Sequence, residues 1–258
     1  MDNDHQPLFT SFQDYFSISL ANTPALQEEI YQIRYRVYCE EFAYLPSENY
    51  PNQRETDEFD TASWHCLITH KTSGASAACV RLVSPATTSG GILLPFEKYC
   101  GKNLDTEFLN SLNLDRQNVC EISRVAIERV FRRRSGEIAS RFGDVLDFSD
   151  LEKRTCSLIT VAAFFAAIAL TELTGRTNVF ALMEPFLAKL LRHHDILFQR
   201  VGNDADYHGI RAPYVITTQA VLDHINPEMT VFYRWVKQQI EIAYPASEVS
   251  IHAPAVPR

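Results

Sequence analysis

The sequence predicts an α/β fold in which a mixed central sheet is flanked by helices. Runs of alternating or β-branched apolar residues indicate strands, which we place at 64–69, 75–83, 119–127, 178–183, 197–201 and 210–217. Amphipathic or wholly apolar stretches indicate helices, which we place at about 105–112, 151–173, 185–193, 219–225 and 227–243. Strands that precede, separate and follow helices are typical of one sheet with helices packed on its faces.

Local signals define the elements in turn. Residues 1–22 lack a clear period, so we expect an N-terminal arm whose aromatic residues dock it onto the body. Thr23-Pro24 begins a helix, because threonine is a good cap and proline suits the first helical position. Lys71-Thr72-Ser73-Gly74 forms a hairpin turn, and Gly175 ends the long helix.

Composition fits one domain at 23–245 followed by a proline-rich tail at 246–258, because 46% of the 258 residues are apolar. The formal charge of -8 argues against nucleic-acid binding. No basic region precedes an apolar stretch at the N-terminus, and the apolar run at 158–170 is shorter than the roughly 18 to 20 residues of a membrane span. Six cysteines without a CxxC pair predict reduced, buried thiols and no metal site. We expect a cytoplasmic protein without a membrane span.

Charged residues stand inside otherwise apolar runs at Arg34, Arg81, Glu121 and Arg124, and an acidic turn lies at 56–60. A buried charge must be paired, so these positions are candidates for a functional site, with a structural ion-pair network as the alternative. For Arg34 and Arg81 we favour bracing of the acidic turn over chemistry. Strict β alternation would place Glu121 and Arg124 on opposite faces, so a shared site requires a bulge between them.

Two segments outside the predicted sheet indicate binding surfaces. Residues 43–61 form a long polar loop, and such loops in compact domains are typically lids or binding segments. An arginine cluster from Arg129 to Arg141 is a patch for an anionic partner, with a solvated basic loop as the alternative.

Charged and aromatic residues occur along the chain in a characteristic order: Arg34, Tyr38, Tyr44, Asp57, Asp60, Arg81, Phe96, Glu121 and Arg124. By this order, the chain from about Leu26 to Val215 resembles the acyl-homoserine-lactone synthase and N-acyl amino acid synthase branch of the GNAT acyltransferases. Within that branch it is most similar to the PEP-CTERM/exosortase system-associated acyltransferases. The resemblance implies the GNAT fold and a bacterial acyltransferase of the EC 2.3.1 class without a permanently bound cofactor.

The resemblance also implies roles for individual residues. It makes four residues catalytic: Glu121, Asp57, Asp60 and Arg124. It makes seven residues substrate-binding: Arg34, Tyr38, Tyr44, Arg81, Phe96, Val125 and Ile127. In direct aminolysis of a thioester, Asp57 and Asp60 would hold the acceptor ammonium and Glu121 would accept its proton. The backbone of Val125-Ala126-Ile127 would bind the oxyanion.

Four further positions are left with two interpretations each. His208 is a candidate base, although a histidine in a turn before a glycine is more often structural. Phe164, Phe165 and Phe186 are candidates for an acyl tunnel, although core packing is the more common role of such residues.

The donor is expected to be an acyl group on acyl carrier protein rather than on coenzyme A. Arg133-Arg134-Ser135-Gly136 matches the first half of the GNAT pyrophosphate loop, but Ile138 replaces its final small residue. An acidic carrier protein would instead dock on the donor-binding residues Arg132, Arg133, Arg134 and Gly136.

The acceptor is expected to be an amino acid or a similar small amine. Tyr38 and Tyr44 stand where the lactone-forming synthases usually have Phe and Trp, which disfavours S-adenosylmethionine. We therefore expect an N-acyltransferase that moves a long-chain acyl group to an amine, with possible peripheral membrane contact through its lipid product. The alternatives are an acyl-homoserine-lactone synthase, an acetyl-CoA-dependent N-acetyltransferase and a non-catalytic ligand-binding GNAT module.

Overall fold

The computed structural model describes residues 7–85, 93–132 and 148–244. The predicted tail at 246–258 lies outside the described residues, and so do Arg133, Arg134 and Gly136 of the predicted donor-binding cluster.

In the described part of the chain, eight strands form the sheet: β1 (Phe16–Leu20), β2 (Ser63–His70), β3 (Ser76–Val83), β4 (Val119–Ile127), β5 (Asn178–Met183), β6 (Gln199–Arg200), β7 (Ala205–Asp206) and β8 (Ile210–Thr217). Their order is β1-β2-β3-β4-β5-β8-β6, with β7 beside β8. The β4–β5 pair is parallel, and the other pairs are antiparallel. The predicted mixed sheet is therefore confirmed.

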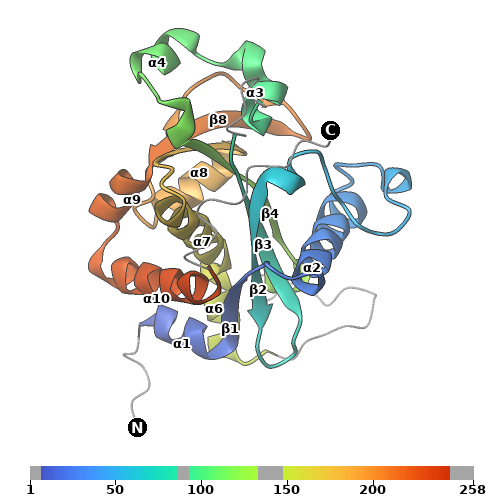
Figure 1. Cartoon of the computed structure of the whole chain (residues 1–258). Coiled ribbons are helices and arrows are strands. Elements are labelled where there is room, and N and C mark those ends of the chain that lie inside the picture. Colours follow the sequence, from blue (N-terminus) through green and yellow to red (C-terminus); the bar gives the residue numbers. More distant parts are fainter. Residues whose placement is uncertain (1–6, 86–92, 133–147, 245–258) are drawn as a thin grey trace.

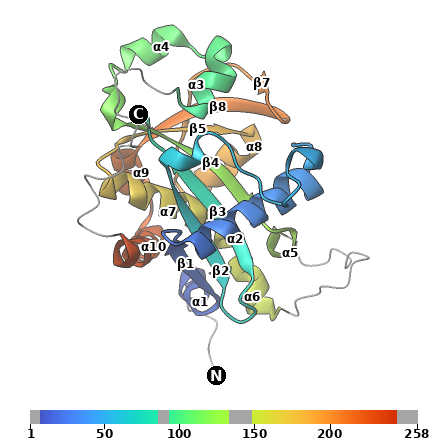
Figure 2. The same ribbon diagram turned by 45° about the vertical axis from the view of Figure 1, so that its right-hand side comes forward.

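The α-helices of the described residues are α1 (Leu8–Tyr15), α2 (Pro24–Tyr35), α3 (Pro95–Cys100), α4 (Thr106–Ser111), α5 (Arg129–Arg132), α6 (Asp150–Thr155), α7 (Ile159–Leu173), α8 (Pro185–Arg192), α9 (Thr218–His224) and α10 (Pro227–Ala243). Helices α7 and α10 pack together over one face of the sheet, while α2 packs on the other (Figures 1 and 2). The alternation of buried residues in β3 and β4 divides the apolar core between these two faces.

The N-terminal segment corrects one prediction. Residues 8–20 do not form an arm beside the domain, because β1 pairs antiparallel with β2 from Phe16 to Leu20 and thus forms an edge of the sheet. Phe9, Phe12 and Phe16 are buried in the main core, and Phe12 packs edge-on against Phe232 of α10. The aromatic residues that were expected to dock an arm therefore make this segment part of the domain.

The apolar stretch before Gly175 is a core helix. By length and composition, residues Asp150–Leu173 pass for a membrane span, but 72% of the apolar window is buried inside the protein. A 3₁₀ turn at Cys156–Leu158 separates α6 from α7. Gly175 follows α7 with a φ of 68°, as expected for a C-cap glycine.

The central parallel strands separate along their length. β4 and β5 are paired from Val119↔Asn178 to Ile122↔Ala181, and the pairing ends there although both strands continue. Among the described residues, no strand thus lies beside the backbone of β4 beyond Ile122 on the β5 side. This opening in the middle of the sheet places the site described next.

A bulge, the condition for a shared site of Glu121 and Arg124, interrupts β4 at Arg124 and Val125. The pairing with β3 shifts by one residue between Cys79↔Ala126 and Arg81↔Ser123, so Arg124 and Val125 both lie opposite Val80. Arg124 has a φ of 50°, which is uncommon for a residue other than glycine. The bulge turns the Arg124 side chain to the same side of the sheet as the acidic loop, as a shared site with Glu121 requires.

Candidate active site

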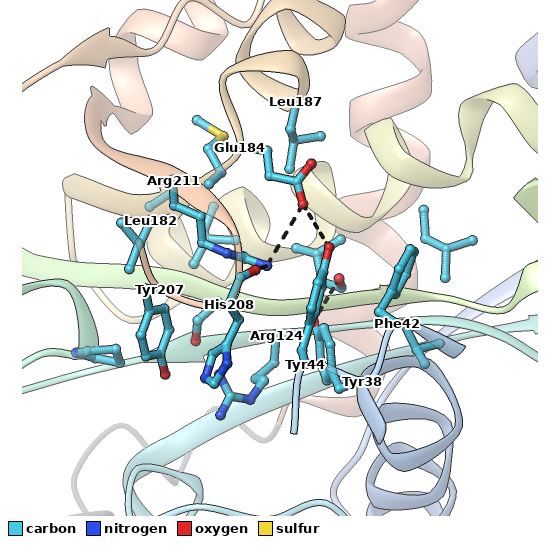
Figure 3. Close-up of a pocket in the computed structure, with 18 of the residues that line it drawn as sticks. Tyr38, Phe42, Tyr44, Arg124, Leu182, Glu184, Leu187, Tyr207, His208 and Arg211 are labelled. Carbon is cyan, nitrogen blue, oxygen red and sulfur yellow. Dashed lines mark hydrogen bonds and ion pairs between the residues drawn. The ribbon is translucent and has the colours of Figure 1, made fainter. Parts of the chain in front are cut away.

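A cavity of about 290 Å³ lies where β4 and β5 separate. Its lining comes from the helical turn Arg36–Glu41 that follows α2, the loop after it, β4, β5, α7, α8 and the β7–β8 turn. Figure 3 shows aromatic, acidic and basic side chains from these elements around the opening. Of the residues predicted to be catalytic, the lining includes Glu121 and Arg124.

Glu121 is a buried carboxylate at the cavity. Its side chain is 1% exposed and accepts a hydrogen bond from the backbone N–H of Phe96 at 2.8 Å. Burial raises the pKa of Glu121 to about 8, an effect that the Phe96 N–H and the more distant Arg81 only partly oppose. A carboxylate with a pKa near neutrality is suited to accept a proton from an attacking amine.

The raised pKa of Glu121 predicts a pH-dependent stability. Between pH 4.5 and about 8 the folded protein keeps a proton that the unfolded chain has released, so the free energy of unfolding falls as pH rises through this window. The contribution is at most about 1.4 kcal/mol per pH unit. Glu121→Gln should remove this pH dependence. In urea unfolding at pH 5 to 9, the free energy of unfolding of the variant should therefore rise relative to that of wild type up to about pH 8. The exposed Glu48→Gln should retain the wild-type slope, and an equal slope in all three proteins would contradict the raised pKa.

A buried ion-pair network joins α2 to the acidic loop. The Arg34 guanidinium is fully buried, and its Nε lies 2.5 Å from Glu55 Oε2 and its Nη1 2.6 Å from Asp60 Oδ1. Glu55 is also fully buried. Although burial acts in the opposite direction, the arginines hold the pKa values of Glu55 and Asp60 below their usual range.

The same network continues to β3 and β4. Arg81 Nη1 contacts Asp57 Oδ1 at 2.5 Å and Asp60 Oδ1 at 2.7 Å. Arg124 Nη2 contacts Asp57 Oδ2 at 2.9 Å and Glu55 Oε1 at 3.1 Å. Three arginines and three carboxylates therefore hold the loop, the helix and two strands together.

The network changes how the sequence-predicted acidic residues are interpreted. Asp57 and Asp60 do not line the cavity and are occupied by arginines, and Arg34 and Arg81 lie outside the cavity with them. This geometry agrees with bracing of the loop by the two arginines. Glu55 was missed by sequence reasoning, because it stands in a polar loop without an apolar neighbour pattern.

Tyr38, Phe42 and Tyr44 form one wall of the cavity (Figure 3). Residues Arg36–Glu41 continue α2 as a π-helical turn, in which the Phe42 N–H donates to the Val37 carbonyl. The Phe42 and Tyr44 rings stack at 5.0 Å, and the Tyr38 hydroxyl donates to the Val125 carbonyl at 2.9 Å. Such π-helical turns are frequent at functional sites, and this one directs two predicted acceptor-binding tyrosines to the cavity.

The backbone amides of Val125 and Ile127 face the opening. Because the Glu128 N–H donates to the Ala77 carbonyl of the β3 side, alternation along β4 turns the amides of Val125 and Ile127 the other way. Both residues line the cavity. The binding of an oxyanion by their N–H groups stays a prediction.

The turn before β8 contributes polar groups that the resemblance did not assign. Tyr207 and His208 of this turn and Arg211 at the start of β8 line the cavity, as does Glu184, which follows β5 (Figure 3). Burial and the nearby Arg124 and Arg211 lower the pKa of His208. His208 has a φ of 55°, so the turn holds it in a strained backbone conformation.

Apolar side chains also line the cavity. Phe164 and Phe186, two of the candidate tunnel residues, line it together with Leu187. Phe165 instead packs edge-on against Phe232 and Tyr233 in the core. Apolar and polar side chains around one cavity suit a substrate with an acyl chain and a polar head.

Two predicted binding residues are placed differently from expectation. Phe96 lies outside this cavity, stacked on Phe180 at 4.3 Å, and reaches the site through its N–H on Glu121. Arg132 lines the cavity with its guanidinium over the Phe42 ring and in an ion pair with Glu41. Within the described residues, no group of three or more His, Cys, Asp or Glu side chains is placed to hold a metal ion.

Residues 33–139 match the family model for the GNAT acetyltransferase domain. The chain carries a GNAT domain. The mixed sheet with its separated parallel strands is the GNAT fold, and the enzyme class that follows is acyltransferase. No curated protein sequence matches the chain at a significant level.

Solved structures share this GNAT fold. A CoA-dependent acyl-homoserine lactone synthase, BjaI, bound to SAM and isopentyl-CoA, is 14% identical, with a TM-score of 0.54 over 86% of this chain and 89% of its own. TofI in complex with an inhibitor and MTA is 20% identical, with a TM-score of 0.55 over 83% and 98% of the two chains. FeeM, an N-acyl amino acid synthase from uncultured soil microbes, is 8% identical, with a TM-score of 0.53 over 81% and 94%.

Proposed function

We propose that this protein is an N-acyltransferase that transfers a long-chain acyl group from a carrier thioester to the amine of an amino acid or similar small acceptor. The observation that carries the proposal is Glu121, a carboxylate with a pKa near 8 that lines a cavity together with apolar side chains. The fold shared with an N-acyl amino acid synthase and with acyl-homoserine lactone synthases supports it.

The acyl chain would lie against the apolar side chains of the cavity. Phe164, Phe186 and Leu187 provide its walls there, and the opening between β4 and β5 admits the thioester. This arrangement brings the thioester carbonyl to the N–H groups of Val125 and Ile127, which would stabilise the oxyanion.

The acceptor amine would attack that carbonyl directly. A C–N bond forms, the C–S bond breaks, and the carrier leaves as a thiol that takes one proton. Glu121 accepts the proton of the attacking amine, directly or through water, and returns it to the thiolate or to solvent. No Ser or Cys nucleophile is required, because positioning of the two substrates supplies much of the acceleration.

The ion-pair network would position these groups. Asp57 and Asp60 hold Arg81 and Arg124, and through them the bulged part of β4 that carries the oxyanion donors. We therefore assign Asp57, Asp60, Arg34 and Arg81 to positioning rather than to the acceptor ammonium. Association with PEP-CTERM systems and bacterial origin follow from the sequence resemblance alone, and a cytoplasmic location follows from composition alone. All three stay predictions.

The decisive experiment offers the purified protein a long-chain acyl group on acyl carrier protein or on coenzyme A, together with single amines. Mass spectrometry then measures the N-acyl product. Acylation of an amino acid supports the proposal, whereas lactone formation from S-adenosylmethionine or transfer of acetyl groups only would replace it with another acyltransferase activity. Tight ligand binding without any product would favour a binding module.

The donor prediction rests on charge. Replacing Arg132, Arg133 and Arg134 by Glu should raise the apparent KM for the acyl carrier protein substrate by about tenfold or more and remove its dependence on salt. The kcat at saturating donor should change little. Arg234→Glu on the distant helix α10 is the control. Unchanged KM and salt dependence in the triple variant would contradict carrier docking on these arginines.

A further inference from the structure

Arg211 differs from the other two arginines that line the cavity. Arg124 is paired with Glu55 and Asp57, and Arg132 with Glu41. The ion-pair contact of Arg211 is to Glu184 at 3.9 Å, a distance at which no strong charge-assisted hydrogen bond forms. Arg211 is thus the least neutralised of the three.

The guanidinium of Arg211 also has an unsatisfied donor. Its Nε is buried without a hydrogen-bond partner, and its Nη2 donates to the His208 carbonyl at 3.5 Å, the limit for such a bond. A buried N–H without a partner destabilises the protein, and a ligand oxygen would remove that cost. Arg211, which carries this unsatisfied N–H, lines the cavity (Figure 3).

The structure holds this guanidinium in a fixed place. It lies over the Tyr44 ring at 5.4 Å from the ring centre, and the Tyr44 hydroxyl donates to Glu184 Oε1 at 3.2 Å. Arg211 itself comes from β8, and Glu184 caps α8. A planar group fixed between a ring face and a carboxylate presents its donors in one direction only.

We propose that Arg211 binds the carboxylate of the acceptor and that the acceptor is therefore an amino acid rather than a simple amine. This inference rests on the proposed function. A carboxylate carries one charge and fits the two-pronged donor edge of a guanidinium. A dianionic phosphate is disfavoured by Glu184, whose carboxylate is 3.9 Å from the same guanidinium.

The arrangement gives selectivity through the same unsatisfied donor. An amine without a carboxylate leaves Arg211 Nε unpaired in the occupied cavity, whereas an amino acid pairs it. Sites built to hydrogen-bond a substrate group can reject the analogue that lacks it by about 10⁴-fold. A more modest preference of about 100-fold or more is expected here, because Arg211 retains the Glu184 contact.

The test compares acceptors that differ at the carboxylate. Wild-type protein with a saturating acyl thioester is given an amino acid, its carboxamide and its decarboxylated amine, and kcat/KM is measured for each. Arg211→Met should lower kcat/KM for the amino acid by about 100-fold, mainly through KM, and change the value for the other two by less than about threefold. Arg211→Lys should recover part of the loss. Arg200→Met, on the neighbouring strand β6 and paired with Asp204, should behave as wild type.

A binding measurement gives a second readout. Calorimetry should show that the N-acyl amino acid binds wild type more tightly than its amide, and that Arg211→Met abolishes the difference. Wild type that acylates all three acceptors equally, or binds acid and amide equally, would overturn the role of Arg211 while the acyltransferase proposal stands. Absence of any N-acyl product and of any product binding would instead overturn the proposed function together with this inference.

Discussion

Glu121→Gln should lower kcat by about 10²- to 10⁴-fold, the usual contribution of a positioned general base. The amide has nearly the same shape and its oxygen still accepts the Phe96 N–H, but it cannot take a proton from the amine. Steady-state formation of the N-acyl product measures the effect. In wild type the activity should rise with pH through about 8, the pKa of Glu121, because the base must be ionised.

The matched control for this substitution is Glu48→Gln, an exposed carboxylate that does not line the cavity. Its kcat should stay within about threefold of wild type. A Glu121→Gln protein that is folded and keeps wild-type turnover would show that the proton leaves by another route. In that case His208, also at the cavity, would be the next candidate base.

Asp60→Asn should lower the free energy of unfolding by about 3 to 5 kcal/mol, as expected when one partner of a buried ion pair is removed. Asp60 neutralises two almost fully buried arginines, Arg34 and Arg81, and accepts the Asp57 N–H at 2.7 Å. The asparagine keeps the shape and loses the charge, so both guanidinium groups are left undercompensated. Urea unfolding near neutral pH measures the change.

Glu58→Gln is the control for the loop, because Glu58 is exposed and pairs with Lys98 at the surface. Its effect on stability should stay below about 1 kcal/mol. Normal stability with slow turnover would contradict the structural role of Asp60. An Asp60→Asn protein of normal stability that turns over about a hundredfold more slowly would mean that Asp60 contacts the acceptor ammonium, as the family resemblance implies.

Much of the sheet was predictable because its signals are local. The alternation along β4, β5 and β8 fixed their bounds at Val119–Ile127, Asn178–Met183 and Ile210–Thr217. The bulge followed from a contradiction between alternation and a shared site, and the register of β3 and β4 confirms it. A Thr23 cap with proline after it likewise begins α2 as expected.

The parts that sequence reasoning missed depend on distant contacts. Residues 8–20 have weak local periodicity, and they become a helix and an edge strand because β2 offers free backbone groups and α10 offers an aromatic surface. Glu55 is buried only because α2, β4 and the loop meet around Arg34 and Arg124. Arg211 lies in the site because β8 runs antiparallel beside β5. The residues next to each of them in the sequence form no pattern that predicts these contacts.

The balanced network of three arginines and three carboxylates also limits how this protein can diverge. Any single change from Arg34, Arg81 or Arg124 to a neutral residue leaves an excess negative charge in the interior, and any change from a carboxylate leaves an excess positive one. A neutral replacement therefore becomes tolerable only as a matched pair of opposite sign. A lineage would have to cross an unstable intermediate to lose the network, so its six positions are expected to be retained or replaced together, even in descendants that acquire a different acceptor.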